Sequence, residues 1–155
     1  MVHGKYSTLV ACLLMVIASH ASDFSTWEGF EADKCASIWL IKRFIAPEAE
    51  IRFYPRGEWN MAGIAFDVPN ARFRRYHNKA TFETLLEHYQ LNDKQLSYIA
   101  RIIHDIEVNI WEKKRMAETS EVQNAMHEII MQKDSKKILA DCRSYFDRLY
   151  SPQKY

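Results

Sequence analysis

The spacing of apolar residues after position 81 constrains the fold of this chain more than any other feature. From Thr81 to Tyr150 the large apolar side chains return every three or four residues, which is the period of an α-helix with one buried face. Four helices are predicted there, at residues 81–91, 93–110, 121–132 and 135–150. Thr81 is expected to cap the first helix, and Asn92 with Gln95 resembles a capping box for the second.

The chain before these helices adds one more helix and a small β element. Residues 34–46 carry an apolar stripe of helical spacing, with Asp33 in front of it and Pro47 at its end. Two segments alternate as short strands do and are expected to pair as a hairpin-like ribbon: 50–54 and 63–68. Residues 22–32 are expected to form a lead-in, and Asp67 to cap the amides of a turn. The predicted fold is a single compact α+β domain, mostly α-helical, with about five helices and a two-stranded β element.

Residues 1–21 have the layout of a secretory signal peptide. They combine a basic start at Lys5, an apolar run from Leu9 to Ala18, and the small-residue cleavage site Ser19-His20-Ala21. An apolar run of this length is too short to span a bilayer, so we expect cleavage rather than an uncleaved anchor. The stretch ending at Cys12 also resembles a lipoprotein processing box, but the apolar run continues past Cys12. The protein is therefore expected to be periplasmic or secreted, and not held at the membrane after cleavage.

The predicted mature chain, residues 22–155, has no overall charge. Without Lys5, 20 basic and 20 acidic residues remain. This balance removes any general attraction to nucleic acid or to an acidic membrane, so only a local patch of charge could recruit a partner. The sequence also lacks a glycine-rich phosphate loop, a G-x-S-x-G elbow, an H-E-x-x-H helix and a C-x-x-C pair. We expect no nucleic-acid partner and none of the enzyme classes built on those motifs.

Two cysteines remain in the predicted mature chain, Cys35 and Cys142. An exported protein meets an oxidising compartment, in which the two thiols could join as a disulfide. Both residues also lie within apolar stripes, where a cysteine behaves as a small buried hydrophobe. The sequence does not supply the geometry that a bridge needs, so both interpretations stay open.

The strongest local charge lies in Ala71–Glu83, which we call the cationic segment. Its cations are Arg72, Arg74, Arg75 and Lys79, and no carboxylate lies between Asp67 and Glu83. Arginine side chains bind oxyanions through paired N–H donors, and a helix beginning at Thr81 would add backbone N–H groups. We therefore predict an anion site. The alternative is a solvated loop, or arginines that pair with carboxylates elsewhere in the chain: Glu31, Asp33 or Glu107.

A second candidate site is built on His104 and Glu107, which share one predicted helix. Residues three apart lie on the same helix face, and an imidazole and a carboxylate at that spacing can ligate a divalent metal ion. Two ligands are too few for a metal, so we expect His77 and Asp33 to complete the set. The alternative is a hydrogen-bonded structural cluster, with Arg75 or His77 paired to Glu107. In that interpretation Asp33 caps the helix that follows it.

Four blocks of the sequence stand out when they are taken together. They are ADKCASIWLIKRFIAPEAEIRFYP (32–55), GIAFDVP (63–69), TFE (81–83) and IIHDIE (102–107). Together they resemble the chromate-resistance exported-protein family, whose domain also forms the C-terminal half of ChrB-type proteins. The long first block is the most specific part of the likeness. Regulator-type members usually carry a histidine where this chain has Arg75 and a cysteine where it has Ala80.

This resemblance implies a periplasmic protein associated with chromate or metal stress. No DNA-binding half is recognised in this chain, so transcriptional regulation is not expected. With the cationic segment, the resemblance predicts an accessory or binding protein for an oxyanion or a metal ion, and Arg75 and Ala80 favour the anion. Two alternatives stay open. One is a metal-dependent redox or hydrolytic enzyme that uses His104 and Glu107, and the other is a structural partner of another periplasmic protein.

Overall fold

A computed structural model describes residues 23–151 of the chain. The strands are β1 (Phe24–Trp27), β2 (Ile51–Tyr54) and β3 (Ile64–Ala65). The helices are α1 (Ala32–Leu40), η1 (Ile41–Ile45), α2 (Thr81–His88), α3 (Lys94–Glu107), α4 (Thr119–Ile130) and α5 (Ser135–Tyr150). The predicted α+β class, mostly helical with five α-helices, is confirmed. The predicted signal peptide, residues 1–21, and the processing box ending at Cys12 lie outside the described residues.

The β element differs from the predicted hairpin-like ribbon. It is a parallel three-stranded sheet in the order β2-β1-β3, so that β2 and β3 both pair with β1 and not with each other. Helix α1 connects β1 to β2, because parallel neighbours need a crossover between them. The predicted lead-in therefore contains the central strand. Its middle residues, Ser25 and Thr26, are polar but fully buried, and this concealed the strand from a search for alternating apolar residues.

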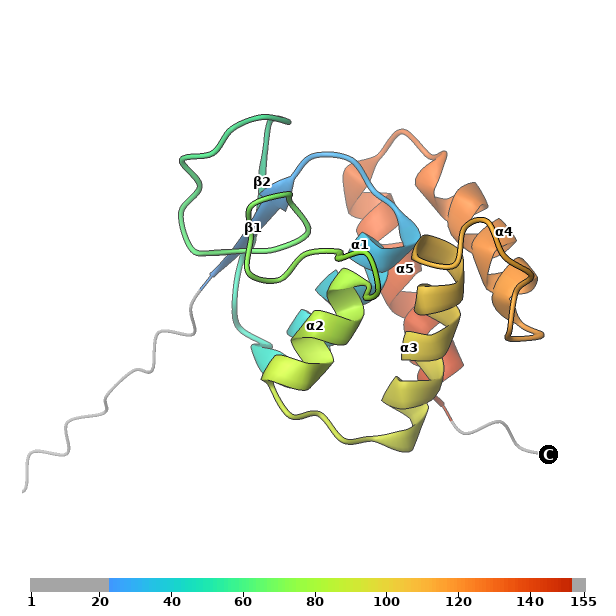
Figure 1. Ribbon diagram of the computed structural model, residues 1–155. Helices are drawn as coiled ribbons and strands as arrows, with labels where there is room; N and C mark the ends of the chain where they lie inside the picture. The colour runs from blue at the N-terminus through green and yellow to red at the C-terminus, as the bar shows by residue number, and fades with distance from the viewer. Residues whose placement is uncertain (1–22, 152–155) are drawn as a thin grey trace, which may run out of the picture.

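Helix α1 is the central element of the molecule, and every one of its nine residues is buried. Helices α2, α3 and α5 pack around it, and the sheet lies at one end of the molecule (Figure 1). The chain continues from α1 into η1, a π-helical turn in which the Ala46 N–H donates to the Ile41 carbonyl. The helical segment ends before Pro47, as predicted.

A disulfide joins Cys35 on α1 to Cys142 on α5, with 5.8 Å between their Cα atoms. The sequence did not decide whether these two cysteines form a disulfide. The structure contains the bond, and it joins the two apolar stripes. Close by, Trp39 packs on Phe146 and donates its indole N–H to the Asp147 carboxylate at 2.9 Å. Helices α1 and α5 are therefore held together by a covalent bond, an aromatic contact and a partly buried hydrogen bond.

Helix α3 begins at Lys94, one residue later than predicted. Asp93, not Asn92, is the N-cap, and its carboxylate accepts hydrogen bonds from the amides of Gln95 and Leu96. The helix ends at Glu107 rather than near residue 110, because the chain there turns into a loop organised by Asp105. No helix among residues 23–151 combines the length and the apolar character that crossing a bilayer would require.

The Asp105 carboxylate fixes the loop between α3 and α4. Its side chain is buried and accepts hydrogen bonds from the backbone amides of Arg115 and Met116 and from the hydroxyl of Thr119. The Asn109 side chain donates a fourth hydrogen bond at 2.9 Å. Burial acts to raise the pKa of Asp105, but these hydrogen bonds together outweigh it and lower the pKa to about 2.

Candidate functional site

The cationic segment folds as a compact loop in front of α2. Phe73 forms a parallel bridge with Phe66, and Tyr76 and Lys79 form an antiparallel bridge that closes a tight turn. His77 lies exposed in this turn. Since side chains on a twisting loop point in different directions, the four predicted anion ligands do not converge on one point.

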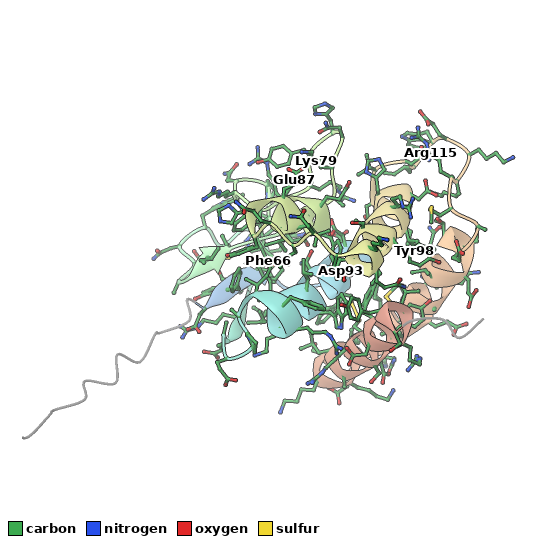
Figure 2. The ribbon with its side chains drawn as sticks, turned by 90° about the horizontal axis from the view of Figure 1, so that it is seen from below. Phe66, Lys79, Glu87, Asp93, Tyr98 and Arg115 are labelled. Atoms are coloured by element: carbon green, nitrogen blue, oxygen red, sulfur yellow. A yellow bond between two sulfur atoms is a disulfide. The ribbon has the colours of Figure 1, made fainter. Side chains whose placement is uncertain are left out.

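Arg72 and Lys79 turn toward the outer face of α2. Lys79 forms an ion pair with Glu87, and the two residues lie together (Figure 2). Arg72 contacts the His88 ring, with 3.1 Å between Nη2 and Nδ1. These two cations are therefore engaged by α2, on a different surface from Arg74 and Arg75.

Arg74 and Arg75 line a pocket of about 410 Å³ at the junction of the sheet and α1. We call it the Arg74–Arg75 pocket. Its cationic side chains are Lys34, Arg56, Arg74 and Arg75, and its acidic ones are Glu28, Glu31 and Asp67. The structure thus unites half of the predicted anion ligands with two cations that the sequence analysis did not select.

Asp33 occupies the N-terminus of α2. Its Oδ2 atom accepts the Thr81 N–H at 2.6 Å, and its Oδ1 atom accepts the Phe82 N–H at 2.8 Å. The Ser37 hydroxyl donates a third hydrogen bond at 3.3 Å. The prediction that Asp33 caps its own helix is therefore wrong, because its carboxylate caps α2 instead. These helix amides are not free for an external anion, which corrects that part of the predicted anion site.

Thr81 is the first residue of α2 rather than its cap. The N-cap is Ala80, whose N–H donates to the Glu83 carboxylate at 2.7 Å. The Thr81 hydroxyl instead donates to Asp67 Oδ1 at 2.8 Å. Asp33 and Asp67 therefore both contact the N-terminus of α2. Asp33 accepts hydrogen bonds from backbone N–H groups of the helix, and Asp67 accepts one from the side chain of Thr81.

Asp67 does not cap local amides, as the sequence analysis expected. Its backbone has a φ of +54°, and its N–H donates to the Phe73 carbonyl at 2.7 Å, which fixes its side chain on the pocket wall. Burial raises the pKa of Asp67 to about 7. The neighbouring Glu31 carboxylate adds to this rise, and Lys34 opposes it.

Lys34 is the main pocket residue that sequence reasoning missed. It lies in the first turn of α1, is only 5% exposed, and donates to the Trp27 carbonyl at 2.8 Å. Its ammonium nitrogen is 3.6 Å from Asp67 Oδ2. A lysine in a helix whose other residues are mostly apolar was the available signal, since a buried lysine needs partners of opposite charge.

Glu107 pairs with Arg75, one of the two arrangements that the sequence left open. Arg75 Nη1 donates to Glu107 Oε2, and the other oxygen of Glu107 accepts the Asp33 N–H at 3.4 Å. Arg75 also lies 3.9 Å from the Glu31 carboxylate. Burial raises the pKa of Glu107, Glu31 adds to that rise, and the Arg75 guanidinium opposes it.

The four predicted metal ligands do not form one cluster. Asp33 and Glu107 are neighbours, but His104 Nδ1 lies 2.9 Å from Glu83 Oε2, and His77 is in the exposed turn. Within residues 23–151 there is no group of three or more His, Cys, Asp or Glu side chains placed to hold a metal ion. The donors present therefore do not fit the predicted divalent ion.

Comparison with known proteins gives two matches. A family model described as "ChrB, C-terminal domain" matches residues 24–153. The Protein ChrB of Cupriavidus metallidurans is 30% identical over 92 residues, which cover 55% of this chain and 27% of that relative. The chain thus spans about a quarter of that relative's length. No solved structure matches.

Proposed function

This chain belongs to the ChrB C-terminal domain family of chromate resistance, and from that premise we propose that it is an exported accessory protein that binds an oxyanion. The proposed export rests on the signal-peptide layout of residues 1–21. The proposed binding site is the Arg74–Arg75 pocket. In this role, a periplasmic protein would encounter an oxyanion before the anion enters the cytoplasm.

The observation that carries the proposal is the convergence of four cations from separate segments on one pocket. Lys34 comes from α1, Arg56 from the loop after β2, and Arg74 and Arg75 from the cationic segment. Guanidinium groups present paired N–H donors that match the oxygens of a tetrahedral anion. Arg56 is exposed and forms no hydrogen bond or ion pair with other residues in the range 23–151.

The charge balance of the pocket also favours an anion. Its four cations outnumber its three carboxylates. One of these carboxylates, Asp67, has a pKa of about 7 because it is buried, so it is partly neutral near neutral pH. The lining residues of the pocket therefore carry a small net positive charge in the pH range of the periplasm, and Glu107, outside the lining, pairs with Arg75.

The proposal is tested by thermal unfolding in the presence of chromate and of phosphate, which is not an oxidant. A ligand that binds only the folded state adds about 2.7 kcal/mol to the free energy of unfolding at a concentration about 100 times its Kd. We expect the Tm to rise with either anion, and the double variant Arg56→Ala/Arg74→Ala to lose this rise.

The matched control is Arg72→Ala/Lys79→Ala. It removes two cations from the cationic segment that face α2 rather than the pocket, so the anion-dependent rise should persist. The absence of any shift with both anions in the wild-type protein would refute the proposed function. Equal loss of the shift in both double variants would show that general positive charge, and not this pocket, holds the anion.

A further inference from the structure

The second carboxylate oxygen of Asp67 lacks a hydrogen-bond donor. The side chain is only 5% exposed and faces the Arg74–Arg75 pocket. Its Oδ1 atom accepts the Thr81 hydroxyl, whereas Oδ2 is buried and accepts no N–H or O–H group in the described part of the chain. A side-chain hydrogen bond between Asp67 and Glu31, which raises the pKa of Asp67, forms only when one of the two carboxyl groups is protonated. Lys34 Nζ lies 3.6 Å from this oxygen, beyond good hydrogen-bond distance, and already donates to the Trp27 carbonyl.

Such an oxygen is an acceptor that a ligand can use. A buried acceptor that is left unpaired is unfavourable, so a ligand that brings a donor to Asp67 Oδ2 gains a hydrogen bond that the unliganded pocket lacks. The left-handed backbone of Asp67 and its hydrogen bond to the Phe73 carbonyl hold the carboxylate in place. The acceptor is therefore built into the pocket before any ligand arrives.

The groups around Asp67 restrict which ligands can bind beside its Oδ2 atom. Glu31 is close enough to raise the pKa of Asp67 through its negative charge, and it lines the same pocket. Once Asp67 is ionised, above its pKa of about 7, an anion whose oxygens carry only lone pairs would face these two carboxylates with no proton between them. Arg56 and Arg74 can donate hydrogen bonds to the oxygens of the anion that point away from Asp67. The oxygen nearest Asp67 meets a carboxylate, so it fits there only if it carries a proton that it can donate.

We propose that the pocket selects tetrahedral oxyanions that carry a proton, because the ligand's O–H donates to Asp67 Oδ2. This inference rests on the proposed oxyanion site and names its ligand class. Hydrogen phosphate retains a proton through neutral pH, and chromate takes up a proton near neutrality. Sulfate has the same shape and charge but is protonated only in strong acid, so it leaves the Asp67 acceptor unpaired and opposed by another lone pair.

The test is titration calorimetry of the wild-type protein with inorganic phosphate and with sulfate at about pH 8, above the pKa of about 7 of Asp67. We expect phosphate to bind at least about tenfold more tightly than sulfate, since a site that hydrogen-bonds a ligand hydroxyl discriminates against the analogue that lacks it. Equal affinities would overturn this inference and leave the proposed oxyanion site standing. Binding of neither anion would overturn both.

Two variants assign the discrimination to Asp67. Asp67→Asn replaces one acceptor oxygen with an amide that can donate to sulfate, so the ratio of the two affinities should fall to about one. Asp134→Asn makes the same substitution at an exposed position outside this pocket and should leave the ratio unchanged. A ratio that survives in Asp67→Asn would overturn the assignment. If that variant does not fold, the wild-type ratio decides the inference.

Discussion

The carboxylate of Asp33, in the first turn of α1, accepts the backbone N–H of Thr81 across a separation of 48 residues. The same side chain accepts the Phe82 N–H, so one buried aspartate on the central helix satisfies two orphan donors of α2. This contact holds the cationic segment, which ends at α2, against α1. The position of the Arg74–Arg75 pocket therefore depends on a residue that does not line it.

The first prediction concerns Asp33→Asn. An asparagine can accept from only one of the two α2 amides, because its NH₂ group would face the other N–H as a second donor. We expect the free energy of unfolding to fall by about 1–3 kcal/mol, measured by urea denaturation. Asp134→Asn is the control, since Asp134 caps α5 at an exposed site where asparagine serves equally well. Equal costs for the two variants would contradict the prediction.

The second prediction concerns the pH dependence of stability. Burial raises the pKa of Asp33 to about 8 and that of Asp67 to about 7, from an ordinary value of 3.8. Between about pH 4 and pH 8 the folded state therefore binds more protons than the unfolded state, so the free energy of unfolding decreases as the pH rises through this window. The stabilisation is complete below about pH 4 and is lost above about pH 8.

This pH dependence is measured by urea denaturation at several values across the window. The charged and polar groups that face Asp67 are Glu31, Lys34, Arg75, Asp33 and Thr81. Together with burial, these groups leave the pKa of Asp67 raised. Asp67→Asn should make the dependence shallower, because one of the two groups no longer titrates. A free energy of unfolding that rises between about pH 5 and pH 8 would contradict the assignment.

Local sequence patterns predicted the helices well because helical periodicity is a local property. Helix α5 has the predicted bounds, Ser135–Tyr150, since its apolar stripe and flanking turn lie in one continuous segment. Strand β1 was missed for the opposite reason. Ser25 and Thr26 are buried because β2 and β3 flank them, and that environment is created by residues far along the chain.

The candidate site was only partly predictable for the same physical reason. Charge density drew attention to Arg74 and Arg75, which line the candidate pocket, but no local rule showed that Lys34 would face them from α1. Asp33 has the sequence context of a local helix cap, and the capping rule is correct about its chemistry. The rule assigns the wrong helix, because the packing of α1 against α2 brings the Asp33 carboxylate to the N-terminus of α2.

The third prediction concerns Asp105→Ala. The variant leaves the partly buried amides of Arg115 and Met116 without their acceptor, and the loop between α3 and α4 loses its anchor. We expect a loss of about 2–4 kcal/mol in urea denaturation and faster proteolysis within residues 108–118. Glu112→Gln, an exposed change in the same loop, should do neither. Unchanged protease resistance in Asp105→Ala would contradict this role.

The fourth prediction concerns the disulfide between Cys35 and Cys142. It closes a loop across 107 residues, and a cross-link of that span restricts the unfolded chain enough to stabilise the fold by about 3–5 kcal/mol. Reduction should therefore lower the Tm, and Cys35→Ala/Cys142→Ala should match the reduced wild type while showing no response to reductant. Because α5 packs on α1 also through Trp39 and Phe146, the reduced protein should still fold and keep its helical circular dichroism. A Tm that does not respond to reductant, in a protein shown by thiol titration to be reduced, would refute a stabilising role for this bond.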